Sequence, residues 1–373
     1  MRVIDAWQRV VIKVGSALLA PDGEGCSTRY LLTLAEFVIW CRKHHKEVLI
    51  VSSGSVAAGR ALVKNQASNK LTIPEKQALA SIGQSELMAF WQRFFDFPCA
   101  QILLTMDDFQ NRERYLNSRN TLSQLLDIGA LPIINENDSV ATEELKVGDN
   151  DNLAADVSVL ANADLLIICS DVDGLYDKNP KEYPDAKLIN KVSQINESIR
   201  KMASSATNAV GTGGMTTKIQ AAEKATEKGI NTIIVNGFEA ETFTALKRSE
   251  NPGTFFQRLQ TPRAAKKHWL YHSTKSAGWI EIDDGALKAI TEQGASLLVG
   301  GIKGHSGRYQ CGDIVDILNQ RKELVGKGMI QFDQKEIEKI KGCQRDDIAQ
   351  RLGYVASPLV IHRNDMALTL SKE

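Results

Sequence analysis

The sequence has no excess of charge of either sign, and it is poor in aromatic residues. Lys plus Arg and Asp plus Glu both number 45, so the formal net charge is zero, which argues against attraction of the whole chain to nucleic acid or to an anionic membrane. Aromatic residues make up 6%, charged residues 24% and hydrophobic residues 43%, a composition typical of globular proteins and not of disordered or collagen-like ones. The length of 373 residues predicts two or three domains, at about 150 residues each.

Cysteine motifs and long apolar runs are also missing. The six cysteines form no CxxC pair, and no histidine follows them at the spacing of a structural zinc site. Cys99 and Cys169 lie in apolar runs, where a free thiol behaves as a small core residue, and this use of cysteine fits a reducing compartment. The first residues lack the apolar segment of a signal peptide, and no apolar stretch approaches the roughly 20 residues that span a bilayer. These absences predict a cytoplasmic protein.

Up to about residue 246, short apolar runs alternate with segments of helical periodicity. Strands are expected at residues 10–14, 48–51, 102–105, 131–135, 165–170 and 232–236. Helices are expected at residues 30–45, 74–95, 115–128, 152–161, 215–228 and 241–246. Apolar strands separated by helices indicate a mostly parallel sheet covered on both faces. The predicted fold class is therefore α/β, as a three-layer αβα sandwich with a mostly parallel central sheet.

The composition changes after residue 250. No acidic residue occurs from Asn251 to Trp279, while basic residues accumulate and two prolines interrupt the stretch, a pattern typical of a linker or an extended connection. Beyond it, strands are expected at residues 296–299, 314–318, 329–332 and 359–362, with short helices at 285–292 and 335–340. We expect these to form a separate small β-rich domain of roughly the last hundred residues.

The first candidate for chemistry is the segment Lys-Val-Gly-Ser at residues 13–16, where a lysine ends an apolar run. Lysine is rarely buried without a partner. Lys13 therefore either points to solvent from an edge strand or places its ammonium group at the carboxyl end of an inner strand. Open α/β sheets bind their ligands at that end, and the second alternative would let Lys13 pair with an anion.

Two loops of small residues would also suit an anion. Residues 52–59, Ser-Ser-Gly-Ser-Val-Ala-Ala-Gly, lead from a strand into a helix, either as an anion-binding turn or as an ordinary serine-capped turn. Residues 211–218, Gly-Thr-Gly-Gly-Met-Thr-Thr-Lys, match neither the Walker A loop nor GxGxxG. They still combine backbone donors, hydroxyl groups, a helix start and Lys218, which are the parts of a phosphate site.

Runs of acidic and amide residues lie between these loops. Residues 135–138, Asn-Glu-Asn-Asp, follow an expected strand, and residues 148–152, Gly-Asp-Asn-Asp-Asn, precede an expected helix. Both runs are also typical of solvated turns, and the second lacks the spacing and terminal glutamate of a calcium loop. Residues 170–176 close a further strand, where Asp171 would accept a hydrogen bond from a nucleotide, hold a lysine or only shape the turn.

The motifs gain specificity from their joint order along the chain. This order resembles the amino-acid kinase family over nearly the whole sequence, through KVGS, SSGSVAAG, INENDSV, VGDNDNLAA, SDVDGLY and GTGGMTTK. The INEND and VGDNDN pair is the most specific part. Two departures are mild: Ser170 stands where the family commonly has threonine, and Ser55 where it commonly has alanine.

The resemblance carries expectations about domains and activity. The segment from Leu297 to Val315 resembles a PUA domain, so the predicted division is a kinase domain at residues 1–258, a basic linker at 259–276 and a PUA domain at 277–373. Within the family, the motifs resemble the branch that transfers the γ-phosphoryl group of ATP to the γ-carboxylate of L-glutamate, the first step of proline biosynthesis. The family carries Mg²⁺ with its nucleotide, bound chiefly through phosphates, and no protein ligand to a metal is expected.

The resemblance also implies the catalytic groups. Lys13 and Lys218 would meet the transferred phosphoryl group, and Asp151 would hold both lysines as a buried counter-charge. The nucleophile is a carboxylate, which is already ionised at pH 7 and needs no general base. The obstacle is repulsion between two anions, so catalysis is expected to rest on positioning and on cations. Two unit charges 4 Å apart at an effective dielectric of 20 interact by about 4 kcal/mol, which makes a lysine near that group important.

The binding residues come from the same resemblance. Glutamate would be bound by Ser53, Asp138 and Asn150, with Asp138 suited to the α-ammonium group and the Asn150 amide able to donate to a carboxylate. ATP would be bound by Lys13, Ser170, Asp171, Thr212, Gly213, Gly214, Met215, Thr216, Thr217 and Lys218.

Two alternatives stay open at this point. The first is a related kinase that acts on N-acetylglutamate or aspartate, although Asp138 favours a substrate with a free amine. The second is an RNA-binding regulatory protein that acts through the PUA domain; mixed charge in the last hundred residues disfavours it, because a phosphate-binding surface needs a basic face. Expected partners are proline as a feedback inhibitor, further copies of the chain in a dimer or tetramer, and a downstream glutamyl phosphate reductase.

Overall fold

A computed structural model describes residues 4, 6–23, 25–63, 71–141, 150–180, 182–205, 214–259 and 276–369. The chain divides into two compact units. The first comprises Met1–Gln110 and Asn117–Pro262, and the second comprises Asn111–Leu116 and Arg263–Glu373. No helix in the described ranges is both long enough and apolar enough to cross a bilayer.

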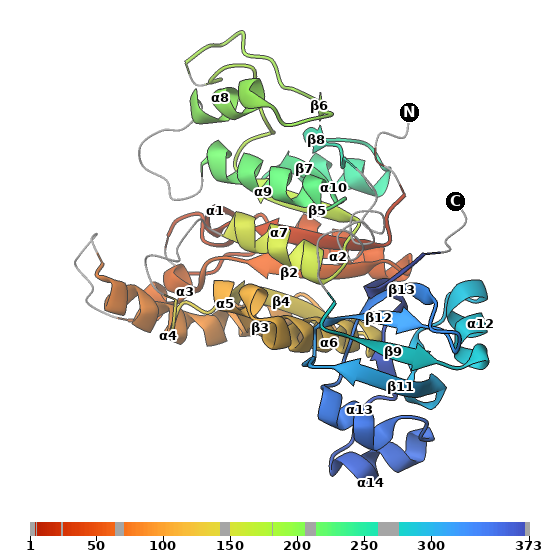
Figure 1. The fold of residues 1–373 in the computed structure, drawn as a ribbon. Helices are drawn as coiled ribbons and strands as arrows, with labels where there is room; N and C mark the ends of the chain where they lie inside the picture. The colour runs from red at the N-terminus through yellow and green to blue at the C-terminus, as the bar shows by residue number, and fades with distance from the viewer. Residues whose placement is uncertain are drawn as a thin grey trace. The chain divides into compact units, whose positions relative to one another are not determined.

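The first unit is built around one large sheet (Figure 1). Its described strands run in the order β3-β4-β2-β1-β5-β7-β8-β6. All neighbouring strands in it are parallel except β7 and β8, which are antiparallel. The strands are β1 (Arg9–Val14), β2 (Glu47–Ser52), β3 (Cys99–Leu104), β4 (Leu131–Glu136), β5 (Leu165–Ser170), β6 (Lys191–Val192), β7 (Asn231–Asn236) and β8 (Thr254–Phe256).

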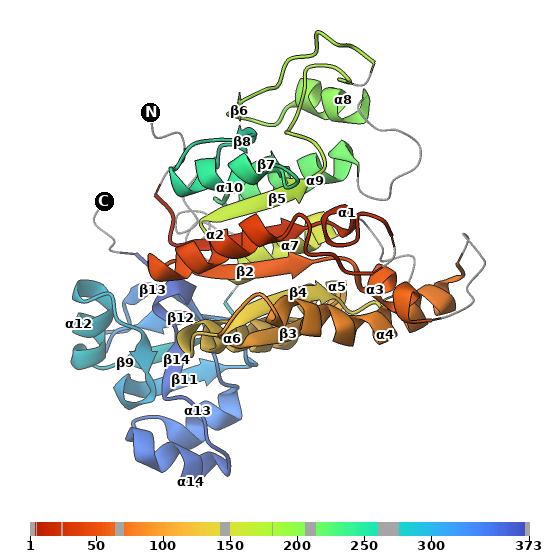
Figure 2. The ribbon, with the colours of Figure 1, turned by 180° about the vertical axis from the view of Figure 1, so that it is seen from behind.

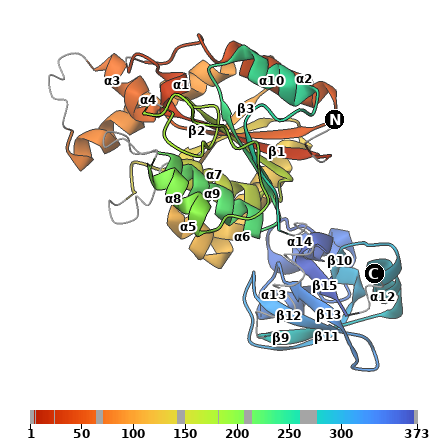
Figure 3. The same ribbon diagram turned by 90° about the horizontal axis from the view of Figure 1, so that it is seen from above.

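Helices cover both faces of this sheet, so the predicted three-layer α/β fold is confirmed. Figure 3 shows α7 and α9 on one face and α2 and α10 on the other. The helices are α1 (Ser16–Leu19), α2 (Leu32–Lys43), α3 (Ser55–Leu62), α4 (Ile73–Gln92), α5 (Met106–Gln110), α6 (Arg112–Asp127), α7 (Asn150–Leu160), α8 (Glu197–Ser205), α9 (Met215–Glu227) and α10 (Ala240–Lys247).

The alternation of side chains along β1 decides which face each residue meets. Val10, Ile12 and Val14 belong to a buried core that includes Phe37 of α2 and Trp91 of α4. Because successive strand side chains point to opposite faces, Lys13 lies on the other face, where α7 packs against β1. The sequence pattern of β1 therefore directs its one charged inner residue toward the α7 and α9 layer.

Helices α3 and α4 are in close contact through two glycines. A β-carbon built on Gly59 would lie 2.0 Å from the carbonyl oxygen of Leu79, and one built on Gly83 would lie 1.9 Å from that of Ser55. Neither position has room for a side chain, since these neighbours are backbone atoms. The contact fixes α3, and with it the loop that joins β2 to α3.

Gly83→Ala is expected to destabilise the first unit by about 2–3 kcal/mol, because the methyl group forces two backbones apart. Urea unfolding followed by circular dichroism would measure the loss. Ser85→Ala is the matched control, since Ser85 lies on the same helix, is exposed and donates only to the carbonyl of Ile82. Equal stability of the two variants would contradict the close helix contact.

The second unit is rich in strands, as predicted, and Figure 2 shows its sheet beside α12, α13 and α14. Its described strands form one sheet in the order β11-β9-β12-β13-β15 and a two-stranded sheet of β10 and β14. The strands are β9 (Gly278–Ile282), β10 (Leu297–Leu298), β11 (Ile302–Gly307), β12 (Ile314–Leu318), β13 (Leu324–Met329), β14 (Leu359–Ile361) and β15 (Met366–Leu368). The helices are α12 (Asp284–Glu292), α13 (Gln334–Ile340) and α14 (Ile348–Leu352), with short 3₁₀ turns η2 (Val299–Gly301), η3 (Arg345–Asp347) and η4 (Arg363–Asp365).

Two local predictions were wrong. The strand expected at 329–332 is β13, which ends at Met329; its Gly326 and Gly328 break the apolar alternation that would have marked it. The stretch interpreted as a linker from Asn251 contains β8, which pairs antiparallel with β7 and so belongs to the first unit. Residues 260–275 of the expected basic linker lie outside the described residues, and the domain boundaries at 258 and 276 stay a prediction.

Candidate active site

The predicted site residues of the first unit gather at one edge of the large sheet. Strand β1 lies between β2 and β5, and β2 pairs with β4 on its far side. Since these strands are parallel, their carboxyl ends share one edge. The chain adds β2 on one side of β1 and β5 on the other, so this edge is a topological switch point, where open α/β sheets bind ligands.

Two lysines from distant segments meet one carboxylate at this edge. The Lys13 Nζ atom lies 2.7 Å from Oδ1 of Asp151, and the Lys218 Nζ atom lies 3.1 Å from its Oδ2. Strand β1 supplies Lys13, the first turn of α7 supplies Asp151 and the first turn of α9 supplies Lys218. The carboxylate is fully buried and the two lysine side chains are 5% and 7% exposed. The alternative that Lys13 points to solvent from an edge strand is therefore wrong.

Neighbouring groups hold this cluster in place. The Thr217 hydroxyl group donates to Oδ2 of Asp151 at 3.0 Å, which adds a second anchor from α9. Gly15 lies against the lysine, because a β-carbon there would be in contact with Lys13 Nζ at 3.5 Å. At the end of β5, burial raises the pKa of the Cys169 thiol to about 12, against the opposing charge of Lys13. Cys169 therefore stays neutral and does not compete for the ammonium group.

The charge of the cluster determines what it binds. The described side chains of the cluster, two ammonium groups and one carboxylate, carry one more positive than negative charge in a largely dehydrated place. Burying an unbalanced charge is unfavourable, and electrostatic interactions there are stronger than in water. The cluster therefore suits an anionic ligand, and it suits one that develops further negative charge during a reaction even better.

The predicted glutamate residues lie beside this cluster, on the β2 and β4 side. Ser53 follows β2, and the next residue, Gly54, has φ of 105°, a left-handed conformation that favours glycine. The Asn150 side chain donates to Ser53 Oγ at 2.8 Å. On the other side of the loop, the Ser55 hydroxyl group donates to Oδ2 of Asp138 at 3.2 Å. The structure thus brings Ser53, Asp138 and Asn150 into one hydrogen-bonded region.

One predicted role differs from the geometry. The Asn150 amide was expected to donate to a substrate carboxylate, but its nitrogen already donates to Ser53 Oγ at 2.8 Å and to Asn135 Oδ1 at 2.9 Å. An amide nitrogen has two hydrogens, so both are used inside the protein. Asn150 can therefore offer a ligand only its side-chain oxygen, which is an acceptor. The donor beside it is the Ser53 hydroxyl group.

The predicted nucleotide residues lie on the β5 and α9 side. Ser170 ends β5 and donates through Oγ to Oδ1 of Asp171 at 3.1 Å, and Asp171 itself is exposed. Gly214 is the N-cap residue of α9, and the helix begins at Met215. The residues of α9 that follow are Thr216, Thr217 and Lys218. Thr212 and Gly213 lie outside the described residues, as do residues 148 and 149 of the second acidic–amide run.

Sequence reasoning missed two participants. Asn135, at the end of β4, joins Asn150 to Gln84 of α4, and both are buried. Asn135 belongs to the motif quoted for the resemblance, so its position was visible although its role was not. Gln84 has no sequence signal, because a polar residue in an amphipathic helix is usually a solvent-exposed one.

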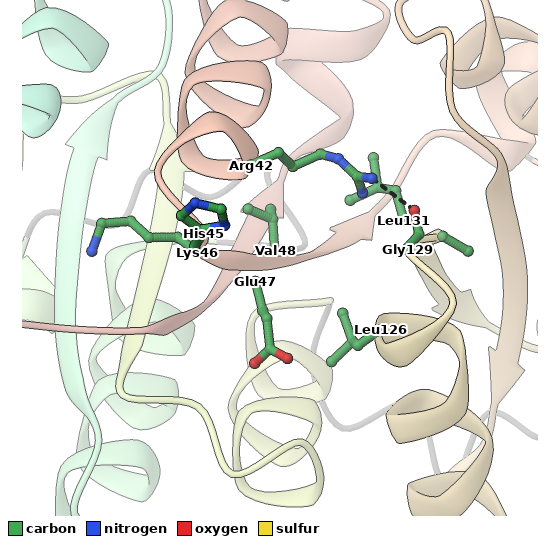
Figure 4. Close-up of a pocket in the computed structure, with 9 residues that line it drawn as sticks. Arg42, His45, Lys46, Glu47, Val48, Leu126, Gly129 and Leu131 are labelled. Carbon is green, nitrogen blue, oxygen red and sulfur yellow. Dashed lines mark hydrogen bonds between the residues drawn. The ribbon is translucent and has the colours of Figure 1, made fainter.

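One cavity of the first unit lies beside the candidate site and another lies away from it. A cavity of about 30 Å³ adjoins Ser55, Gln84 and Asp138, next to the predicted glutamate residues. A larger cavity of about 240 Å³ lies at the amino ends of β2 and β4, between Glu47 and Leu131 (Figure 4). It is at the sheet edge opposite the lysines, because Glu47 and Leu131 are the first residues of their strands. The larger cavity is therefore separate from the candidate active site.

The described residues contain no cluster of three or more His, Cys, Asp or Glu side chains that would hold a metal ion. The lysine cluster offers positive charge from the protein itself.

The chain is similar to known proteins over nearly its whole length. Residues 8–236 match the Amino acid kinase family and residues 278–352 match the PUA domain. The chain is 50% identical over 366 residues to "Glutamate 5-kinase" of Salinibacter ruber, which covers 97% of each chain. It is 49% identical to "Glutamate 5-kinase" of Idiomarina loihiensis over 97% of this chain and 98% of that one. It is 46% identical to the protein of the same name from Xanthomonas euvesicatoria, over 96% of this chain and 100% of that one.

Proposed function

The chain belongs to the amino acid kinase family, and on that premise we propose that it phosphorylates L-glutamate with ATP, the first step of proline biosynthesis. Relatives that share about half of its residues over nearly its full length are glutamate 5-kinases. The observation in the structure that carries the proposal is the convergence of Lys13 and Lys218 on Asp151.

The reaction joins two anions, and the lysine cluster is suited to that task. An oxygen of the glutamate γ-carboxylate attacks the γ-phosphorus of ATP, the bond to the β,γ-bridging oxygen breaks, and ADP leaves with that electron pair. No proton has to be removed from the nucleophile at pH 7. Lys13 and Lys218 reduce the repulsion as the reactants approach and stabilise the charge that spreads over the transferred group. Asp151 holds both ammonium groups in place.

Glutamate would lie on the β2 and β4 side of the lysines. The Ser53 hydroxyl group accepts a hydrogen bond from the Asn150 amide. Its own hydrogen is left to donate to a substrate carboxylate. The carboxylate of Asp138 and the oxygen of Asn150 are acceptors, suited to the α-ammonium group. An acetylated amine would lose its charge and two of its three N–H donors there, so Asp138 favours free glutamate over N-acetylglutamate.

ATP would lie on the β5 and α9 side, with its phosphates at the start of α9. The backbone N–H groups of a helix start and the helix dipole favour an anion there, and Lys218 lies in the same turn. Ser170 and Asp171 would contact the nucleoside, and Thr212 and Gly213 would complete the loop. Mg²⁺, when bound, neutralises phosphate charge as part of the metal–nucleotide complex; none of the steps above needs a protein ligand for it.

A substrate panel tests the proposal. Purified protein, ATP and hydroxylamine, which traps an acyl phosphate as a hydroxamate, are expected to give product with glutamate at a kcat/KM at least about 100-fold above that with aspartate or N-acetylglutamate. Omitted hydroxylamine and UMP as acceptor are the controls. Preference for aspartate or N-acetylglutamate, or salt-dependent RNA binding without turnover, would replace this function by the corresponding alternative.

Further expectations attach to this function. Cytoplasmic location, assembly into a dimer or tetramer, feedback inhibition by proline and transfer of the acyl phosphate to a reductase stay predictions, as does regulation or subunit packing as the role of the PUA domain.

A further inference from the structure

We propose that a chain of three buried amides, those of Gln84, Asn135 and Asn150, which starts at helix α4, orients the Ser53 hydroxyl group as a donor to glutamate, so that Gln84 and Asn135 are positioning residues for the substrate. This inference rests on the proposed function and adds to it the origin of glutamate affinity. Gln84 and Asn135 act through Asn150 and Ser53 and do not contact the substrate themselves.

The chain consists of three consecutive hydrogen bonds between side chains, and a fourth joins its end to Gln101. Asn150 Nδ2 donates to Ser53 Oγ at 2.8 Å and to Asn135 Oδ1 at 2.9 Å. Asn135 Nδ2 donates to Gln84 Oε1 at 3.0 Å, and Gln84 Nε2 donates to Gln101 Oε1 at 3.2 Å. Asn135, Asn150 and Gln84 are buried, with exposed fractions of 2%, 7% and 8%. The chain therefore links α7, β4 and α4 through dehydrated amides, while Gln101 of β3, beyond its end, is exposed.

One backbone group fixes the direction of the whole chain. The N–H of Glu136 donates to Asn135 Oδ1 at 2.9 Å, and a backbone N–H can only donate. Asn135 must therefore present its oxygen toward Glu136 and Asn150, and its nitrogen toward Gln84. Reversal of any single amide would place two donors or two acceptors against each other, which is costly for buried groups.

The direction of the chain decides what Ser53 offers to a ligand. Because Asn150 must donate to Asn135, its second hydrogen is directed at Ser53 Oγ, and the serine oxygen acts as the acceptor. The hydroxyl hydrogen is then left to point outward. A hydroxyl group that is held in this way is prepared to donate to a carboxylate, and hydrogen bonds to charged groups are the stronger ones.

Helix α4 also holds the backbone of the same loop. Trp91 Nε1 donates to Ser52 Oγ at 3.0 Å, and Ser52 Oγ donates to the carbonyl of Ser53 at 3.1 Å. Gln84 and Trp91 are seven residues apart, so they lie on the same face of the helix two turns apart. One helix face thus supports both the position of Ser53 and, through the amides, the direction of its hydroxyl group.

The test is a set of substitutions at Gln84, measured in the full-length enzyme. Gln84→Met keeps the length of the side chain and removes the acceptor for Asn135, so Asn135 and then Asn150 lose their fixed direction. We expect the KM for glutamate to rise about 5- to 20-fold, as for a weakened hydrogen bond to a charged group, with kcat and the KM for ATP within about twofold of the wild-type values. Gln84→Glu keeps an acceptor for Asn135 and is expected to restore most of the affinity.

Gln92→Met is the matched control on the same helix. Gln92 accepts from the N–H of Cys99 and donates to the carbonyls of Phe95 and Phe97, so its loss removes hydrogen bonds of similar number without touching the chain of amides. Its KM for glutamate is expected to stay at the wild-type value. An unchanged KM in Gln84→Met, an equal rise in Gln92→Met, or no recovery in Gln84→Glu would each overturn the inference. Wild-type enzyme that fails to phosphorylate glutamate would instead overturn the proposed function.

Discussion

Lys218→Met is expected to lower kcat by about 10²- to 10³-fold while the fold is retained. An ammonium group about 4 Å from a transferred charge contributes up to about 4 kcal/mol at an effective dielectric of 20, and each 1.36 kcal/mol is a factor of ten in rate. Methionine keeps most of the buried alkyl volume of Lys218. Asp151 keeps Lys13 and the Thr217 hydroxyl group as partners, so the carboxylate is not left alone.

Lys224→Met is the control for this prediction. Lys224 lies on the same helix and also pairs with a carboxylate of α7, that of Asp156, at 2.5 Å. It is 36% exposed, and it is two turns further from the start of the helix. Kinetics with the hydroxamate assay are expected to show near-wild-type kcat for Lys224→Met. Near-wild-type kcat in a folded Lys218→Met protein would remove Lys218 from the catalytic groups.

The sequence predicts the framework well, because local patterns determine it. The runs at β1, β2, β4, β5 and β7 are short, apolar and followed by turn residues, and these are properties of neighbouring residues. The prediction fails for segments whose structure depends on tertiary contacts and not on the local sequence pattern. Strand β8 is recognisable only by its pairing with β7, and β13 contains glycines that no strand pattern favours.

In the candidate site, too, residue identities could be predicted from the local sequence, while the orientation of the side chains could not. Residue types and order were sufficient to name Lys13, Asp151 and Lys218, but whether Lys13 is inside or outside depended on strand order, which places β1 between β2 and β5. The direction of the Asn150 amide depended on Glu136 and Asn135, two hydrogen bonds away from Ser53. Gln84 is separated from Asn135 by 51 residues, so no spacing rule could have joined them. Orientation of polar groups is a property of the folded network.

Asp151→Asn is expected to reduce kcat by about 100-fold or more and to destabilise the first unit by about 3–5 kcal/mol, the cost of removing one partner from a buried ion pair. The carboxylate side chain is fully buried between two ammonium groups, so the amide leaves two like charges facing each other. The two ammonium groups then separate, which removes the geometry that receives the phosphoryl group. Kinetics and thermal unfolding measure the two effects.

The KM for ATP of Asp151→Asn distinguishes the loss of the buried negative charge from damage to the fold. Removal of one negative charge strengthens the attraction for an anionic nucleotide, so the KM for ATP in Asp151→Asn is expected to stay level or fall while kcat drops. Damage to the fold would raise KM and lower kcat together.

Asp156→Asn is the control, because Asp156 pairs with Lys224 between the same two helices. Burial already raises the pKa of its carboxyl group, and the charge of Lys224 opposes this rise. That variant loses less stability, since Lys224 reaches solvent, and keeps its kcat. If Asp156→Asn and Asp151→Asn lose activity alike, Asp151 serves only to join the helices, and the lysines need no shared counter-charge.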